Sequence, residues 1–81
     1  MAKELSITQI EGHVKTLMNT FNEAGGRGKS DPSVFLRALE IRIGNFAPGT
    51  KFTILGRDSF MINGSSYRLT LSNGKASISK L

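Results

Sequence analysis

Side chains that could do acid–base or metal chemistry are few and scattered in this chain. His13 is the only histidine, there is no cysteine, and the histidine borders an apolar helical stripe between Ile10 and Leu17. The acidic residues occur one at a time, so no two carboxylates have the spacing that acid–base catalysis or a metal site needs. The pattern therefore predicts a protein that is not an enzyme, with no catalytic residue, no metal site and no cofactor.

A glycine-rich basic segment, residues 24–30, contains Arg27 and Lys29. Its end, Gly28-Lys29-Ser30, matches the tail of a phosphate-binding P-loop. A P-loop also needs a preceding strand and a glycine where this chain has Glu23, so that motif is rejected. Two interpretations remain: a basic loop ahead of a helix N-terminus, where backbone amides can meet an anion, or a plain linker.

Basic residues are concentrated in the second half of the chain. Residues 1–50 hold six Lys and Arg against five Asp and Glu, whereas residues 51–81 hold five against Asp58 alone. This asymmetry indicates a surface that attracts a polyanion, although many solvated sheet faces carry Lys and Arg for solubility only. The candidate nucleic-acid-binding residues are Arg27, Lys29, Lys51, Arg57, Arg68 and Lys75.

The first predicted helix has signals at both ends. Ser6 and Gln9 have the spacing of a capping box, and the Gly25-Gly26 pair is typical of a helix C-terminus. Gly12 lies on the face opposite the apolar stripe. In the interior of a helix, glycine lowers the stability of the helix by about 1 kcal/mol relative to Ala. The stripe itself consists of Ile7, Ile10, Val14, Leu17, Met18 and Phe21.

The second predicted helix begins at Asp31 as N-cap, with Pro32 at the first helical position. It is apolar on two sides, so we expect it to be sandwiched between the sheet and either the first helix or a partner subunit. Residues 39–43 also alternate at strand period, and a strand there remains the alternative. One apolar side contains Phe35, Leu36, Leu39, Ile43 and Phe46, and the other contains Val34, Ala38 and Ile41.

The sequence pattern of residues 50–80 predicts an antiparallel β-meander. Asn63-Gly64 and Asn73-Gly74 supply the two positive-φ positions of type I′ turns, and we expect strands at about 51–56, 59–62, 66–72 and 75–80. Alternation divides the side chains between two faces. The helix-facing set is Phe52, Ile54, Phe60, Ile62, Tyr67, Leu69, Leu71, Ala76 and Ile78, and the opposite face is mostly Lys, Arg, Ser and Thr.

Together these signals predict one α+β domain over residues 1–81, with two N-terminal helices packed on one face of a C-terminal four-stranded antiparallel meander. The helical half covers residues 1–46. A chain this short seldom gains more than about 3–5 kcal/mol from its core, and disulfides are ruled out. Self-association, most simply as a dimer, is therefore expected.

The predicted function is that of a small basic protein that contacts RNA or DNA mainly through backbone phosphates. The open sheet face offers Lys, Arg and hydroxyl groups for phosphates but no aromatic residue on which bases could stack. In its length, lack of cysteine and α+β pattern, the chain resembles the small accessory proteins of bacteriophages and mobile elements. The second helix, which is apolar on two sides, and the edge strand of the sheet give the alternative, a protein–protein interaction module or inhibitor of that accessory type, acting through the second helix or a sheet edge.

The expected location is the cytoplasm, without membrane association. The first residues contain no apolar signal segment, and no run approaches the length of a membrane span, about 20 apolar residues.

Overall fold

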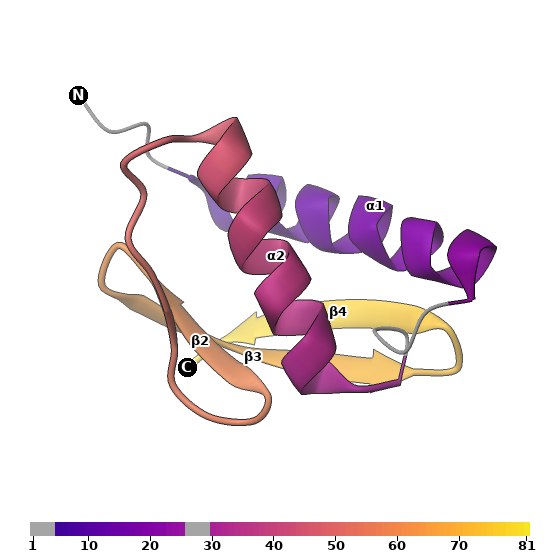
Figure 1. Cartoon of the computed structure of the whole chain (residues 1–81). Helices are drawn as coiled ribbons and strands as arrows, with labels where there is room; N and C mark the ends of the chain where they lie inside the picture. Colours follow the sequence, from indigo (N-terminus) through magenta and orange to yellow (C-terminus); the bar gives the residue numbers. More distant parts are fainter. Residues whose placement is uncertain (1–4, 26–29) are drawn as a thin grey trace.

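Two helices and one sheet make up most of residues 5–25 and 30–81, the part of the chain that the computed structural model describes. The elements are α1 (Ile7–Ala24), α2 (Pro32–Phe46), β1 (Phe52–Ile54), β2 (Ser59–Ile62), β3 (Ser65–Ser72) and β4 (Lys75–Lys80). The sheet is antiparallel with the strand order β1-β2-β3-β4. Both helices cover the same face of it (Figure 1), which confirms the predicted α+β architecture.

Side-chain and backbone caps fix the ends of α1 where the sequence predicts them. The Gln9 N–H donates to the Ser6 hydroxyl (3.2 Å), and the Ser6 N–H donates to Oε1 of Gln9 (3.0 Å). Gly25 ends the helix at a φ of 73°, and its N–H donates to the Phe21 carbonyl (2.8 Å). The capping box and the glycine stop are therefore confirmed.

The start of α2 also follows the sequence signal. The Ser33 N–H donates to Oδ1 of Asp31 (3.0 Å), and Pro32 occupies the first turn, where its missing N–H costs nothing. Residues 39–43 are helical, so the strand alternative is wrong at that position. The helix continues because Leu39 and Ile43 both face the core at helical spacing.

Two Asn-Gly turns set the register of the sheet. Asn63 and Gly64 have φ values of 49° and 91°, and Asn73 and Gly74 have 50° and 74°, as type I′ turns require. β1 is shorter than the expected 51–56, because the Ser59 carbonyl accepts from the N–H groups of both Leu55 and Gly56 (2.9 and 3.2 Å) and so turns the chain. The other three strands agree with the predicted ranges to within one residue.

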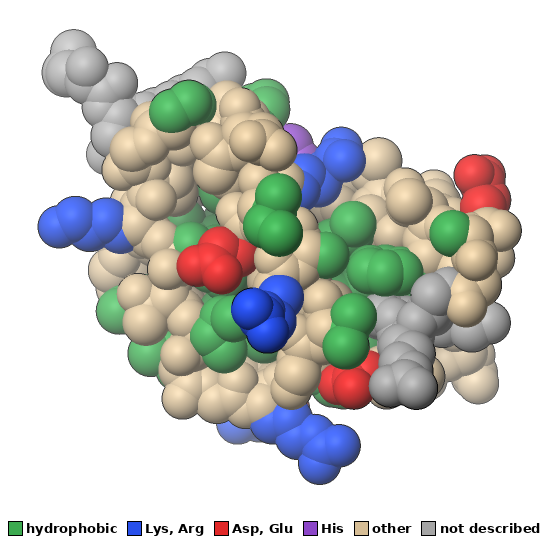
Figure 2. Space-filling view, in the orientation of Figure 1, with side chains coloured by type: hydrophobic (Ala, Val, Ile, Leu, Met, Phe, Trp, Pro, Cys, Tyr) green, Lys and Arg blue, Asp and Glu red, His purple; other side chains and the backbone are tan. Residues whose placement is uncertain are grey.

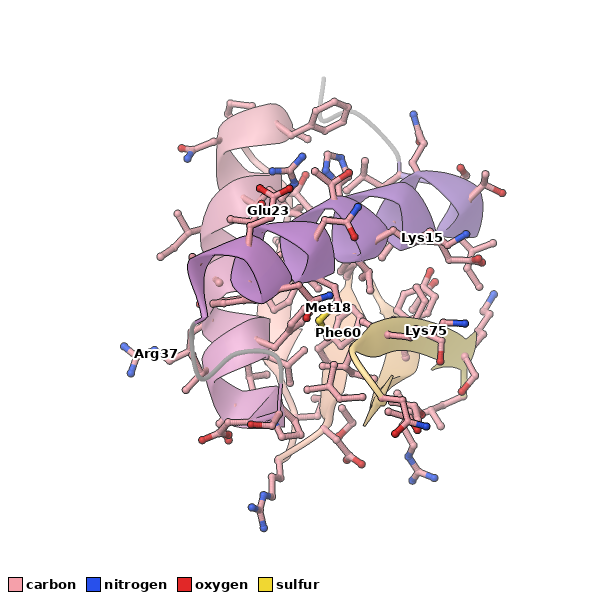
Figure 3. The ribbon with its side chains drawn as sticks, turned by 90° about the vertical axis from the view of Figure 1, so that its right-hand side faces the viewer. Lys15, Met18, Glu23, Arg37, Phe60 and Lys75 are labelled. Carbon is pink, nitrogen blue, oxygen red and sulfur yellow. The ribbon has the colours of Figure 1, made fainter. Side chains whose placement is uncertain are left out.

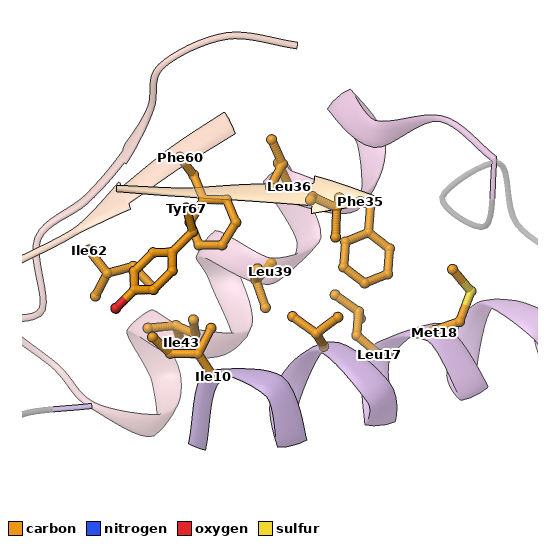
Figure 4. Close-up of a cluster of buried hydrophobic side chains, with 12 residues drawn as sticks. Ile10, Leu17, Met18, Phe35, Leu36, Leu39, Ile43, Phe60, Ile62 and Tyr67 are labelled. Atoms are coloured by element: carbon orange, nitrogen blue, oxygen red, sulfur yellow. The ribbon is translucent and has the colours of Figure 1, made fainter. Parts of the chain in front are cut away.

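The core lies between the helices and the sheet (Figure 4). Leu39 of α2 is at its centre, with α1 on one side and the sheet on the other. The buried cluster consists of Ile10, Val14, Leu17, Met18, Phe35, Leu36, Leu39, Ile43, Phe60, Ile62, Tyr67 and Leu69. Every member belongs to an apolar set that the periodicity predicts.

Some residues that the sequence predicts to be buried are partly exposed to solvent. Ile54 on the edge strand β1 is 39% exposed and Phe46 at the end of α2 is 41% exposed, because each lies at the margin of the packed layers. The second apolar side of α2 is covered only in part. Ala38 packs on the core cluster, whereas Ile41 is 66% exposed. Within one chain, then, α2 is not sandwiched along its whole length.

Gly12 gives a direct stability prediction. A Cβ at this position in the middle of α1 would have no atom within 4 Å, so Gly12→Ala should stabilise the protein by about 0.5–1 kcal/mol through helix propensity alone. Gly64→Ala is the contrasting variant, because its φ of 91° strains a residue with a side chain and should lower stability. Urea unfolding midpoints would check both signs. A destabilising Gly12→Ala would show that another backbone packs closely there.

Candidate nucleic-acid interface

The sheet face turned away from the helices carries three of the six predicted binding residues. Arg68 lies near the middle of β3, and the register places it directly beside Ser59 of β2 and Ser79 of β4. The remaining rows of this open face pair Thr70 with Ser77, Ser72 with Lys75, and Ser66 with Met61 and Thr53. Arg68 is therefore surrounded mainly by hydroxyl groups.

Two lysines mark opposite ends of the open face. Lys51 precedes β1 and is held by Asn63, whose N–H donates to the Lys51 carbonyl (3.0 Å) and whose Oδ1 accepts from the Lys51 N–H (3.0 Å). Lys75 begins β4 opposite Ser72. At ~3.3 Å per residue and ~4.8 Å per strand, the two lysines span a diagonal of roughly 30 Å with Arg68 between them.

The charged side chains of the open face are positive. Lys51, Arg68 and Lys75 are exposed, and none has an ion pair within the described residues. Asp58 is the only acid of residues 51–81 and lies in the β1–β2 connection, where its carbonyl accepts from the Leu69 N–H (2.7 Å). An approaching polyanion would therefore meet cations that no carboxylate of the described strands neutralises.

The aromatic residues of the sheet are on the other side. Phe52 stacks on Phe60 with ring centroids 5.3 Å apart, and Phe60 stacks on Tyr67 at 5.5 Å. This row packs in the core, with Phe60 and Tyr67 fully or almost fully buried. No aromatic side chain from the described strands is available on the open face for stacking with bases.

The structure brings together three of the six predicted residues. Lys51, Arg68 and Lys75 share the open face, whereas Arg57 is exposed in the β1–β2 connection at the edge of the sheet. Arg27 and Lys29 lie outside the described residues. The prediction of a basic loop before α2 therefore stays a prediction.

The open face also has apolar members. Leu55, 50% exposed, and the partly buried Met61 lie where the sequence predicts them. Leu81 adds a third, because its N–H donates to the Ser66 carbonyl (2.9 Å) and so continues β4 by one residue. These side chains offer contact area beside Arg68 without adding charge.

His13 belongs to a different cluster, at the crossing of α1 and α2. Nε of Arg42 donates to Nδ1 of His13 (3.1 Å), and the His13 ring meets the edge of the Phe46 ring at a centroid distance of 4.5 Å. Burial, and then the charge of Arg42, hold the pKa of His13 below its ordinary value. The histidine is thus a structural acceptor between helices, as its apolar setting in the sequence suggests.

The lowered pKa of His13 predicts a pH dependence of stability. When the pH falls below about 6.5, the unfolded chain takes up the proton before the folded one. The contribution of His13 is therefore fully present above that pH and is lost as the pH falls towards the folded-state pKa. Urea midpoints at pH 7.5 and 5.5 should differ in the wild type and differ less in His13→Gln. Equal differences in both proteins would contradict this role.

One cation that the sequence did not single out, Lys15, lies on the helix side of the sheet, away from the open face. Lys15 of α1 lines a hollow beside Gly74–Ser77, at the start of β4. The sequence gives no signal for this position, because helical periodicity does not show which strand the helix covers.

Comparisons with models of protein families, with curated proteins and with solved structures give no match. In the described residues, no helix combines the length and apolar character needed to cross a membrane. The same part of the chain contains no cluster of three or more His, Cys, Asp or Glu side chains that could hold a metal ion.

Proposed function

We propose that this chain is a small, basic, non-enzymatic protein that binds nucleic acid through the open face of its sheet. The observation that supports this most is the placement of Arg68 between Ser59 and Ser79, on a face where Lys51 and Lys75 add charge and no acid of the described strands opposes them. A cytoplasmic location is part of the same proposal.

The chemistry of the face favours phosphate contact over base recognition. Lys and Arg release counterions from a nucleic acid, and hydroxyl groups donate to phosphate oxygens. Single-strand binders stack bases on exposed aromatic side chains, and the sheet aromatics here are in the core. The diagonal of roughly 30 Å between the two lysines is close to one helical turn of a duplex, ~34 Å. We therefore propose a duplex or a structured RNA as ligand, bound with little sequence preference.

Two arginine variants test the role of the open face. Arg68→Gln should weaken binding of labelled duplexes several-fold and by about the same factor for unrelated sequences, because a phosphate contact carries no sequence information. Arg37→Gln removes the same charge from α2, on the opposite side of the molecule from Lys75 (Figure 3), and should change little. Equal losses in both variants, or a loss for one sequence only, would argue against this interface.

The exposed side of α2 supports a second candidate function, self-association. Hydrophobic side chains are visible over α2 and between the two helices in Figure 2. Ile41 is the most exposed large hydrophobic residue of the described chain, and Gly44, three residues on, has open space at its Cβ position. In a twofold pair of α2 helices, Ile41 of each copy could rest on Gly44 of the other, as an isologous contact requires.

The dimer proposal has its own test. Sedimentation of the wild type should show a dimer at high protein concentration, and Ile41→Glu should move the equilibrium to monomer because it places a charge in the contact. Leu55→Glu, the same kind of change on the open sheet face, should leave the dimer intact. A wild type that stays monomeric at every concentration would exclude this candidate.

A further inference from the structure

The outer edge of β4 and the adjacent side of α1 form a groove of about 420 Å³. Lys15, Met18 and Asn19 supply the helical wall, and Gly74–Ser77 supply the strand wall. Figure 3 looks at this side of the molecule and shows Lys15 above Lys75, with Met18 further in. The groove thus has an apolar floor between two cationic side chains.

Along the same edge, backbone groups of β4 have no hydrogen-bond partner among residues 5–25 and 30–81. The Leu81 N–H donates to the Ser66 carbonyl (2.9 Å), which makes this a hydrogen-bonded pair of the antiparallel ladder. Such pairs alternate along two strands, so Lys75, Ser77 and Ser79 direct their N–H and C=O groups towards β3. The N–H and C=O groups of Ala76, Ile78 and Lys80 then point out of the sheet. Their spacing fits the backbone of one more strand.

The backbone edge and its charge together select the kind of partner. A nucleic acid has no alternating peptide N–H and C=O groups to complete the ladder, so the edge fits a polypeptide. A second copy would bring together two halves that each hold five Lys and Arg against one Asp. Lys15 and Lys75 instead complement carboxylates.

We propose that this groove binds an extended acidic segment of a partner protein as a fifth strand on β4. Main-chain hydrogen bonds from Ala76, Ile78 and Lys80 hold the segment, carboxylates meet Lys15 and Lys75, and alternate apolar side chains rest on Met18 and Ala76. Lys75 also belongs to the open face, so such a segment competes with nucleic acid for one cation. The observations behind the site are the register of the ladder and the groove, so the proposal does not depend on nucleic-acid binding.

Labelled peptides test the site directly. A fluorescent octapeptide of alternating Glu and Val should bind to the full chain at low salt by anisotropy. Hydrogen exchange should then slow at the amides of Ala76, Ile78 and Lys80. A peptide with Lys in place of Glu, and one with Pro in place of every Val, should bind at least roughly tenfold more weakly because they lose charge attraction or backbone donors. Absent binding, equal binding of the Pro peptide, or protection elsewhere would overturn the proposal.

Matched variants separate this site from the nucleic-acid interface. Lys15→Gln should weaken acidic-peptide binding by about threefold to fivefold, as loss of an exposed ion pair does, while Lys51→Gln leaves it unchanged. Ala76→Pro removes an outward N–H without breaking the β3 ladder, as edge strands permit, and should weaken peptide binding by about threefold to tenfold. The reverse ranking of the two lysine variants would contradict the groove as the site. Duplex binding measured in parallel should depend on Lys51 and not on Lys15.

Discussion

Leu39→Ala should leave the protein largely unfolded at 25 °C. Leu39 is fully buried at the centre of the core, between the sheet and α1 (Figure 4). Truncating a buried leucine costs about 2–5 kcal/mol, and a core of this size seldom gives more than about 3–5 kcal/mol in total. Far-ultraviolet circular dichroism and a urea titration would measure the loss.

Leu55→Ala is the matched control for Leu39→Ala. It makes the same chemical change on the open sheet face, where Leu55 is 50% exposed, so its unfolding free energy should fall by only about 0.5 kcal/mol. Similar losses at the two positions would mean that the packing between helices and sheet does not control stability. A folded Leu39→Ala with an unchanged midpoint would have the same meaning.

Removing the three open-face cations together should nearly abolish nucleic-acid binding. Each phosphate contact contributes a slope of about −0.9 in log affinity against log salt for duplex DNA, or roughly eightfold between 1 M and 0.1 M salt. The triple variant Lys51→Gln, Arg68→Gln and Lys75→Gln should therefore lose roughly 10²–10³-fold in duplex affinity at 0.1 M salt. Titration of a labelled duplex at fixed salt gives this ratio.

The triple variant needs a control for net charge alone. Replacing Lys15, Arg37 and Arg42 by Gln removes three charges from the two helices and leaves the open face intact. If both triple variants lose the same affinity, net charge and not the open face determines binding. Unfolding midpoints for the two proteins would show whether either loss arises from instability, which matters because Arg42 bonds to His13.

The elements with local signals were predictable from the sequence. The Ser6 capping box, the Asp31 N-cap and the two Asn-Gly turns depend on residues a few positions apart, and each is confirmed. The two turns determine the register of the strands, and this register places Arg68 between Ser59 and Ser79. The residues of the open face therefore follow from the alternation along the strands and the positions of the two turns.

Contacts between distant segments could not be derived in this way. His13 and Arg42 are 29 positions apart, and nothing in either helix alone indicates their hydrogen bond. The groove beside Lys15 depends on which strand α1 covers, and the exposure of Ile41 depends on how α1 and α2 cross. Helical periodicity identifies an apolar side but not its neighbour.

The most direct test of phosphate contact by the open face is a salt series with the purified wild-type protein, using labelled RNA and DNA duplexes and a single strand. Log affinity should fall linearly with log salt, with a slope of about −2 to −3 for three contacts, and the duplexes should bind more tightly than the single strand. The slope should become shallower by about one in Arg68→Gln. Absence of binding to every probe at low salt, or a slope that Arg68→Gln leaves unchanged, would contradict phosphate contact by this face.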